Sequence, residues 1–146
     1  MFERVLVALD LDDAAGARVL MARAAALARK FGTRLTLVHV RPDLPRSYAR
    51  ALPDAWDMGE QEAAERELEG LAAAHGCGAS LDGVFAPAGT VAREITRLAV
   101  KLDADAILVG AHRMDLGRVM LGTQTTAITR DAPCDVLVVR AEEPED

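Results

Sequence analysis

The stretch DAILVGAHRMDLGRVMLGTQTTAITRDAPCDVLVVR, from Asp105 to Arg140, decides the fold. An apolar run, Ala106 to Val109, ends at Gly110 and is followed by a polar loop. A helical segment then begins at Gly122-Thr123, and a second apolar run, Val136 to Val139, closes the unit. Strand, loop, helix and strand in this order place backbone N–H groups at a helix N-terminus, where they bind anions. The stretch therefore predicts a phosphate-binding site.

The rest of the chain alternates between apolar runs of strand length and segments with helical periodicity. The strands are expected at Val5 to Leu9, Arg34 to Val40 and Ala79 to Ala86, and the helices from Asp13 to Lys30, Glu60 to His75 and Thr90 to Leu102. This alternation predicts an α/β fold with a mostly parallel sheet and helices on both faces. The segment from Arg41 to Met58 has three prolines and no clear period, so we expect a loop there.

Composition narrows the classes of function. The 146 residues predict one domain, 1–141, and an acidic tail, 142–146. A net charge of −6 with no long basic run argues against nucleic-acid or anionic-membrane partners. The N-terminus begins with a strand rather than a charged leader, and no apolar run is long enough to span a membrane. We therefore expect a cytoplasmic protein.

The cysteines and two of the histidines carry no recognisable motif. Cys77 and Cys134 lie 57 positions apart, form no Cys-x-x-Cys motif and no cluster with histidines, so two independent reduced thiols are expected. His39 falls within a predicted strand and His75 at a helix end, which favours structural roles for both. There is no nucleophile elbow, Walker lysine or metal-ligand cluster.

Several segments together resemble the universal stress protein (UspA) family. They are G-x-H-R-x-D-(x)6-G-T from Gly110 to Thr123, the final P-C-x-V-L-V-V strand, V-L-V-A-L-D-L-D-D from Val5, L-T-L-V-H-V from Leu35, and A-G-T-V-A-R-E-I from Ala88. The resemblance covers nearly all of Val5 to Arg140. It implies a Rossmann-like (adenine nucleotide alpha hydrolase-like) fold with five parallel strands in the order 3-2-1-4-5. It also implies a homodimer through the last strand, Asp135 to Arg140.

The resemblance further implies an adenine nucleotide, ATP or a relative, as ligand, with Mg²⁺ or Mn²⁺ as accompanying metal. Ligands of such sheets bind at the carboxyl ends of the strands. Asp10 would contact the ribose or, indirectly, the metal, and the main chain of Val40 would contact the adenine edge. The full set of expected nucleotide-binding residues is Ala8, Leu9, Asp10, Val40, Gly110, His112, Arg113, Gly122, Thr123 and Gln124.

The loop departs from the G-x-x-G-(x)9-G-S/T pattern of many nucleotide-binding relatives. Arg113 replaces the second glycine, and only eight residues separate it from Gly122. An arginine here supplies a cation that can pair with phosphate. His112 can donate to a phosphate or act as a weak general acid, although a locally packed loop histidine explains it equally well.

Four functions remain open at this point. The leading hypothesis is a nucleotide-binding regulatory protein of the stress response, and the second is a nucleotide-independent protective or interaction dimer. Slow ATP hydrolysis or self-phosphorylation is a third, for which the sequence offers no dedicated catalytic residue. A flavoprotein is disfavoured because no aromatic residue flanks the loops to stack on a flavin.

Overall fold

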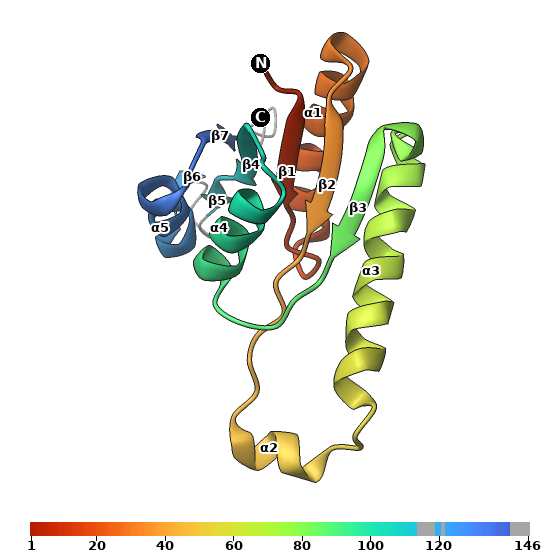
Figure 1. Cartoon of the computed structure of the whole chain (residues 1–146), viewed down its shortest axis with the longest axis vertical. Helices are drawn as coiled ribbons and strands as arrows, with labels where there is room; N and C mark the ends of the chain where they lie inside the picture. Colours follow the sequence, from red (N-terminus) through yellow and green to blue (C-terminus); the bar gives the residue numbers. More distant parts are fainter. Residues whose placement is uncertain (114–118, 121, 141–146) are drawn as a thin grey trace, which may run out of the picture.

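The computed structural model describes residues 1–113, 119–120 and 122–140. Five parallel strands form the main sheet in the order β3-β2-β1-β4-β7 (Figure 1). The strands are β1 (Arg4–Ala8), β2 (Arg34–Val38), β3 (Leu81–Phe85), β4 (Ala106–Gly110) and β7 (Asp135–Val139). Because β7 is the fifth strand of this sheet along the chain, the expected order 3-2-1-4-5 is confirmed.

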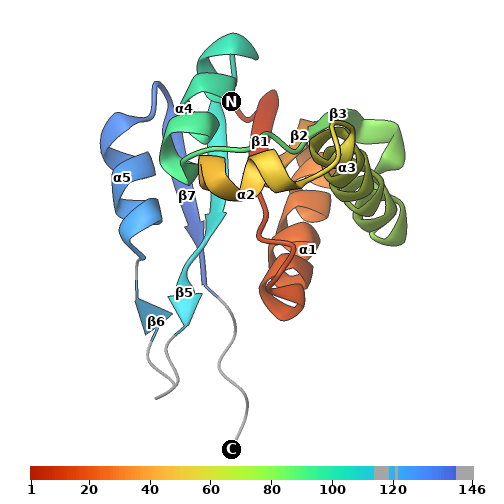
Figure 2. The same cartoon turned by 90° about the horizontal axis from the view of Figure 1, so that it is seen from below.

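Helices cover both faces of the sheet, as predicted (Figure 2). One face carries α1 (Ala14–Phe31) and α3 (Trp56–Ala74), and the other carries α4 (Val91–Lys101) and α5 (Thr123–Asp131). Alternate residues of β1 serve the two sides, because Val5 and Val7 pack against α1 whereas Leu6 packs against α4. Strands buried on both faces explain the continuous apolar runs of the sequence.

Local sequence signals fix the bounds of α1. The Asp13 carboxylate accepts a hydrogen bond from the Gly16 N–H (3.1 Å) and caps the helix N-terminus. Gly32 ends the helix in the left-handed conformation (φ 66°), where its N–H donates to the Ala28 carbonyl. The predicted helix from Asp13 to Lys30 is thus one residue short of the observed end.

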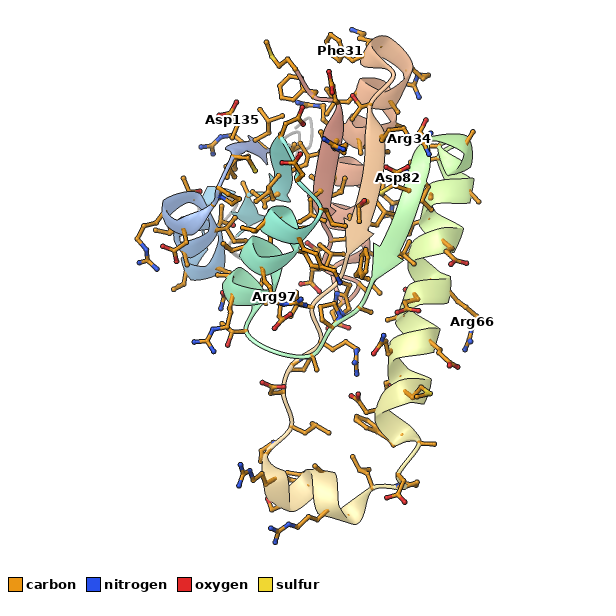
Figure 3. The ribbon with its side chains drawn as sticks, in the orientation of Figure 1. Phe31, Arg34, Arg66, Asp82, Arg97 and Asp135 are labelled. Carbon is orange, nitrogen blue, oxygen red and sulfur yellow. The ribbon has the colours of Figure 1, made fainter. Side chains whose placement is uncertain are left out.

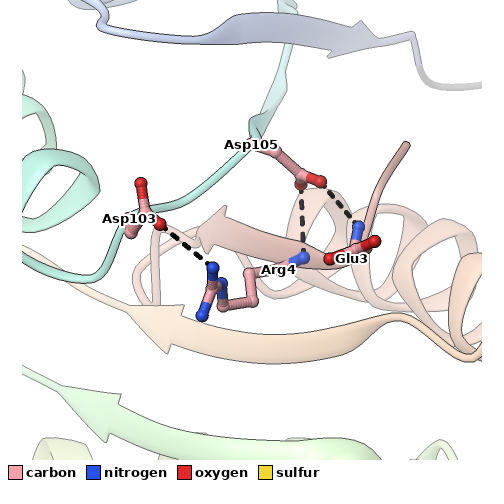
Figure 4. A network of polar contacts seen from close by, with 4 residues as sticks. All are labelled: Glu3, Arg4, Asp103 and Asp105. Atoms are coloured by element: carbon pink, nitrogen blue, oxygen red, sulfur yellow. Dashed lines mark hydrogen bonds and ion pairs between the residues drawn. The ribbon is translucent and has the colours of Figure 1, made fainter.

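Polar contacts tie the N-terminal ends of neighbouring strands together. The Asp105 carboxylate accepts hydrogen bonds from the backbone N–H groups of Glu3 (2.7 Å) and Arg4 (3.2 Å), and the Arg4 guanidinium pairs with Asp103 (Figure 4). Arg34 at the start of β2 pairs with Asp82 of β3 (Figure 3). These contacts lie at the N-terminal ends of the strands, opposite the cavity side of the sheet described below.

The segment from Arg41 to Met58 is not the loop that its prolines predicted. It contains a short helix, α2 (Arg46–Ala51), and α3 begins at Trp56, before the expected Glu60. None of the residues of α2 is buried, so no amphipathic pattern marks it in the sequence. Residues 42–55, which we call the arm, project from the body of the molecule (Figure 1).

The loop after β4 also contains short strands that its polarity did not predict. The backbone of β5 (His112–Arg113) pairs antiparallel with β6 (Val119–Met120). Asp115 of the motif and the acidic tail, 142–146, lie outside the described residues. A 3₁₀ turn, η1 (Gly78–Ser80), precedes β3.

Both cysteines are free thiols, as expected from their spacing. Burial raises the pKa of the Cys77 thiol and that of the Cys134 thiol. Over the part of the chain that the structure describes, no helix has the length and apolar character that crossing a membrane requires.

Candidate functional site

A cavity of about 870 Å³, which we call the strand-end cavity, opens at the carboxyl ends of β1, β2 and β4. It is bounded by the β1–α1 turn, the residues after β2, the start of α4 and the start of α5. Eight of the expected site residues line it: Ala8, Leu9, Asp10, Val40, Gly110, Gly122, Thr123 and Gln124. A parallel sheet brings them together because its strands all end at the same edge.

His112 and Arg113 are the two expected residues that are not among those lining this cavity. Their backbone forms β5, which follows Ala111 of the cavity wall. Their side chains lie outside the described part of the structure. Their expected roles at the phosphates therefore stay predictions.

Two helices begin at the cavity without a hydrogen bond from the side chain of their own N-cap residue, although Gln124 Oε1 accepts from the Ala92 N–H of α4 (3.3 Å). Gly122 and Thr90 occupy the N-cap positions of α5 and α4, and neither caps its helix with a side-chain hydrogen bond. Uncapped first-turn N–H groups and the helix dipole attract anions. By contrast, α1 is capped by Asp13, so its N-terminus is already satisfied.

The backbone of Val40 faces the open end of β1. Within the described residues, no hydrogen bond satisfies the Val40 N–H or C=O, whereas His39 donates to Phe85 and Arg41 donates to Pro87. Because backbone groups alternate between the two sides of an extended chain, those of Val40 point to the β1 side. A flat heterocycle with a donor and an acceptor on one edge suits such a pair.

Asp10 lies at the cavity mouth, directly after β1. Its carboxylate is exposed and accepts a hydrogen bond from the Asp12 N–H (2.9 Å), so one of its oxygens organises the turn. The other oxygen has no partner among the described residues. In the described residues, no group of three or more His, Cys, Asp or Glu side chains lies close enough to hold a metal ion.

A second cavity, of about 730 Å³, lies between the body, the arm and α3, and we call it the arm cavity. It shares Asp12, His39 and Pro42 with the strand-end cavity. His39 lines both cavities. Its Nδ1 lies 3.2 Å from both the Leu11 nitrogen and the Leu9 carbonyl oxygen, and these contacts stabilise the β1–α1 turn. The structural role expected for His39 agrees with these contacts.

Sequence reasoning missed several residues of the strand-end cavity. Gly89 and Thr90 precede α4, and a Gly-Thr pair before a helix is the signal that was recognised at Gly122. Thr125 and Ile128 come from the inner face of α5, and no local signal distinguishes them from core residues.

The whole of this architecture matches a known family. Residues 1–140 match the model of the Universal stress protein family. This chain belongs to the universal stress protein family. A universal stress protein of Thermus aquaticus is 32% identical over 96% of this chain and 100% of its own length. A putative universal stress protein of Staphylococcus saprophyticus is 48% identical over 52 residues, 34% of this chain and 31% of its own.

Solved structures share the fold of this universal stress protein. The hypothetical protein MJ0577 aligns with a TM-score of 0.77 at 20% identity, over 99% of both chains. UspA from Lactobacillus plantarum aligns with a TM-score of 0.74 at 23% identity, over 95% of this chain and 98% of its own. A universal stress protein in complex with cAMP aligns with a TM-score of 0.63 at 21% identity, over 95% and 97%.

Proposed function

We propose that this universal stress protein binds ATP, or a related adenine nucleotide, in the strand-end cavity and acts as a regulatory homodimer in the stress response. The observation that carries the proposal is the convergence of eight expected site residues and two uncapped helix N-termini on one cavity. Its volume suits a ligand of nucleotide size.

The adenine and ribose are assigned to the β1–β2 side of the cavity. The unpaired backbone groups of Val40 would donate to and accept from the adenine edge. The free carboxylate oxygen of Asp10 would accept a hydrogen bond from a ribose hydroxyl. The cAMP complex of a structural neighbour supports an adenine ring as the base that this fold accommodates.

The phosphates are assigned to the β4–α5 side. Gly110 and Gly122 let the phosphate chain approach the backbone, and Thr123 adds a hydroxyl at the start of α5. His112 and Arg113 would contact the phosphates from β5. Mg²⁺ or Mn²⁺, when present, would enter with the phosphates, with Asp10 as an indirect ligand.

The first test replaces a glycine at the start of α5. Gly122→Asp should abolish ATP binding in a folded domain, because a carboxylate would stand where the phosphates bind. Gly59→Asp is the matched control, since Gly59 lies in α3 outside both cavities with no atom within 4 Å of an added Cβ. Isothermal titration calorimetry measures both affinities, and circular dichroism checks folding. Unchanged affinity in folded Gly122→Asp would contradict the proposal.

The second test concerns the cation that replaces a glycine in the loop. Arg113→Ala should weaken ATP binding by about 1.5–3 kcal/mol, the scale of a hydrogen bond to a charged group. Adenosine, which has no phosphate, should bind almost unchanged. Equal losses for the two ligands in calorimetry would show that Arg113 supports the loop rather than the phosphates.

The proposed dimer forms through β7, which is a terminal strand of the sheet. A dimer that forms with full stability and carries no nucleotide after purification would favour the second candidate function, a nucleotide-independent protective or interaction dimer. Mass spectrometry of small molecules released from the purified protein distinguishes the two.

A further inference from the structure

The arm cavity lies beside the strand-end cavity but contains none of the residues assigned to the nucleotide. Its walls come from the arm, from the adjoining part of the body and from one face of α3. The α3 residues that line it recur every three or four positions and so form a single stripe along the helix: Trp56, Glu60, Ala63, Ala64 and Glu67. This stripe is about three helical turns long, roughly 16 Å at a rise of about 1.5 Å per residue.

The arm cavity contains apolar surface. Leu44 and Leu52 line it from the arm, and Trp56 lines it from α3 together with two alanines. Exposed large apolar side chains gather in the same part of the chain, because Leu44 is 40% exposed, Tyr48 66% and Met58 65%. These are three of the six exposed large apolar residues in the described structure. Apolar side chains clustered in this way mark an interaction surface.

The charged residues of the arm cavity are almost all acidic. Six carboxylates line it, and they come from all three of its walls: Asp12, Asp43, Asp54, Asp57, Glu60 and Glu67. Arg41 is the one arginine or lysine in the lining, and it already pairs with Asp57 (2.8 Å). Within the described residues, the other five carboxylates form no ion pair. The arm cavity therefore attracts cationic groups.

The basic residues of the two helices beside the cavity do not neutralise it. Arg46 and Arg50 of α2 are exposed and do not line the cavity. Arg66 is the one basic residue of α3, and its side chain points away from the arm (Figure 3). A second copy of the chain, with its net charge of −6, is disfavoured as the occupant because like charges repel. The charge of the cavity favours a basic partner instead.

We propose that the arm cavity is the docking surface for a basic amphipathic helix of a partner protein. The apolar face of that helix would lie on Trp56 and the alanines of α3, and its lysines or arginines would pair with the carboxylates of the arm and of α3. Helix-in-groove recognition of this kind buries one apolar stripe, and three turns of helix match the length of the α3 stripe. Trp56 adds an aromatic face, which attracts cations. The inference is independent of the proposed nucleotide function, so either can fail without the other.

Trp56 provides the readout of the first experiment, because it is the only tryptophan of the chain and lines the cavity. The probe is a synthetic peptide of leucine and lysine with helical periodicity, about three turns long. Its control is the same peptide with glutamate in place of lysine. The lysine peptide should shift the Trp56 emission to shorter wavelength as the indole loses water, and the glutamate peptide should leave it unchanged. No shift with the lysine peptide would overturn the proposal.

Paired variants of α3 distinguish docking in the cavity from general attraction to an acidic protein. Replacing two lining residues, Glu60→Gln with Glu67→Gln, should weaken binding of the lysine peptide roughly 10-fold, the effect of losing two partly desolvated charge pairs. The matched control is Glu62→Gln with Glu69→Gln, which removes the same charge from residues of α3 that do not line the cavity. It should leave the affinity almost unchanged, because salt screens these charges. Calorimetry measures both affinities, and equal weakening would show that the peptide responds only to net charge, against the proposal.

Sedimentation velocity of the protein without peptide tests the other possible occupant, a second copy of the chain. The wild type and the Glu60→Gln with Glu67→Gln variant should have the same oligomeric state. A change of state in that variant and not in the Glu62→Gln with Glu69→Gln control would show that a second copy covers the arm cavity. The proposed partner helix would then be wrong.

Discussion

At the scale of single residues, one glycine determines the conformation of the connection between β3 and α4. Gly89, between β3 and α4, has a φ of +153°, and a Cβ placed there would lie 3.0 Å from Cγ of Glu94. Its N–H donates to the Arg41 carbonyl (2.9 Å), which fixes the start of α4 against the end of β2. Small changes at this glycine therefore act on the geometry of the strand-end cavity.

Gly89→Ala should destabilise the protein by about 1–3 kcal/mol, because an L side chain at this φ is strained and would also displace Glu94. Gly70→Ala is the opposite control. Gly70 lies inside α3 with open space around an added Cβ, so alanine there should stabilise the helix by roughly 0.5–1 kcal/mol. Urea denaturation of both variants measures the difference, and effects of equal sign would refute the backbone argument.

At the scale of elements, one arginine joins the start of α3 to the end of β3, next to the arm. Arg41 pairs with Asp57 at the start of α3 (2.8 Å), and its Nε donates to the Ala86 carbonyl at the end of β3 (2.7 Å). Its side chain is only 11% exposed, so both contacts are shielded from solvent on the arginine side. Arg41 thus connects the start of α3 with the end of β3. The helix α2 has no buried residue and so contributes no packing to this connection.

Arg41→Ala should lower the free energy of unfolding by about 1.5–3 kcal/mol, because it leaves a buried carbonyl without its charged donor. The control is Arg130→Ala. Arg130 pairs with Asp131 at a solvent-exposed position, and such pairs contribute little to stability, so its unfolding midpoint should not change. Denaturant titrations followed by circular dichroism test this, and equal destabilisation by the two variants would contradict the role of Arg41.

The elements that the sequence predicted correctly are those with a buried face or with a recognisable signal at their ends. The run from Val5 to Leu9 and the capping pair of Asp13 and Gly32 are local signals, and the structure contains both elements. The short helix α2 has no buried face, so its residues carry no periodic pattern. The β5–β6 pair is equally invisible, because two residues in each strand are too few to show alternation.

The candidate site was predictable only as far as chain position determines it. Residues directly after a strand, such as Asp10 and Gly110, lie at the cavity because all parallel strands end at one edge. Thr125 reaches the same cavity from the first turn of α5, and its position depends on how α5 packs against α4. Packing between elements that are distant in sequence has no local signal, so the inner wall of the cavity required coordinates.

At the scale of the whole molecule, the two edge strands of the sheet, β3 and β7, differ in chemistry. The β3 edge carries Asp82, an exposed charged residue that discourages pairing with another strand. The β7 edge, DVLVV, is apolar, and Val136, Leu137 and Val138 are only partly buried in the single chain. The structure places this strand at the edge, as its sequence predicted. An apolar edge of this kind favours pairing about a two-fold axis with the same strand of a second copy.

The orientation of the β7 backbone makes the proposed dimer testable with one residue. The Val139 carbonyl accepts from the Ala111 N–H beside β4, so the groups of Val138 point away from β4, toward the free edge. Val138→Pro therefore removes an edge N–H and leaves the ladder between β4 and β7 complete. We expect it to produce monomer or aggregate in sedimentation velocity, whereas Val138→Ala, which keeps the N–H, should remain a dimer. An intact dimer in Val138→Pro would place the interface elsewhere on the molecule, because two strands cannot pair through an edge that lacks its central donor on both copies.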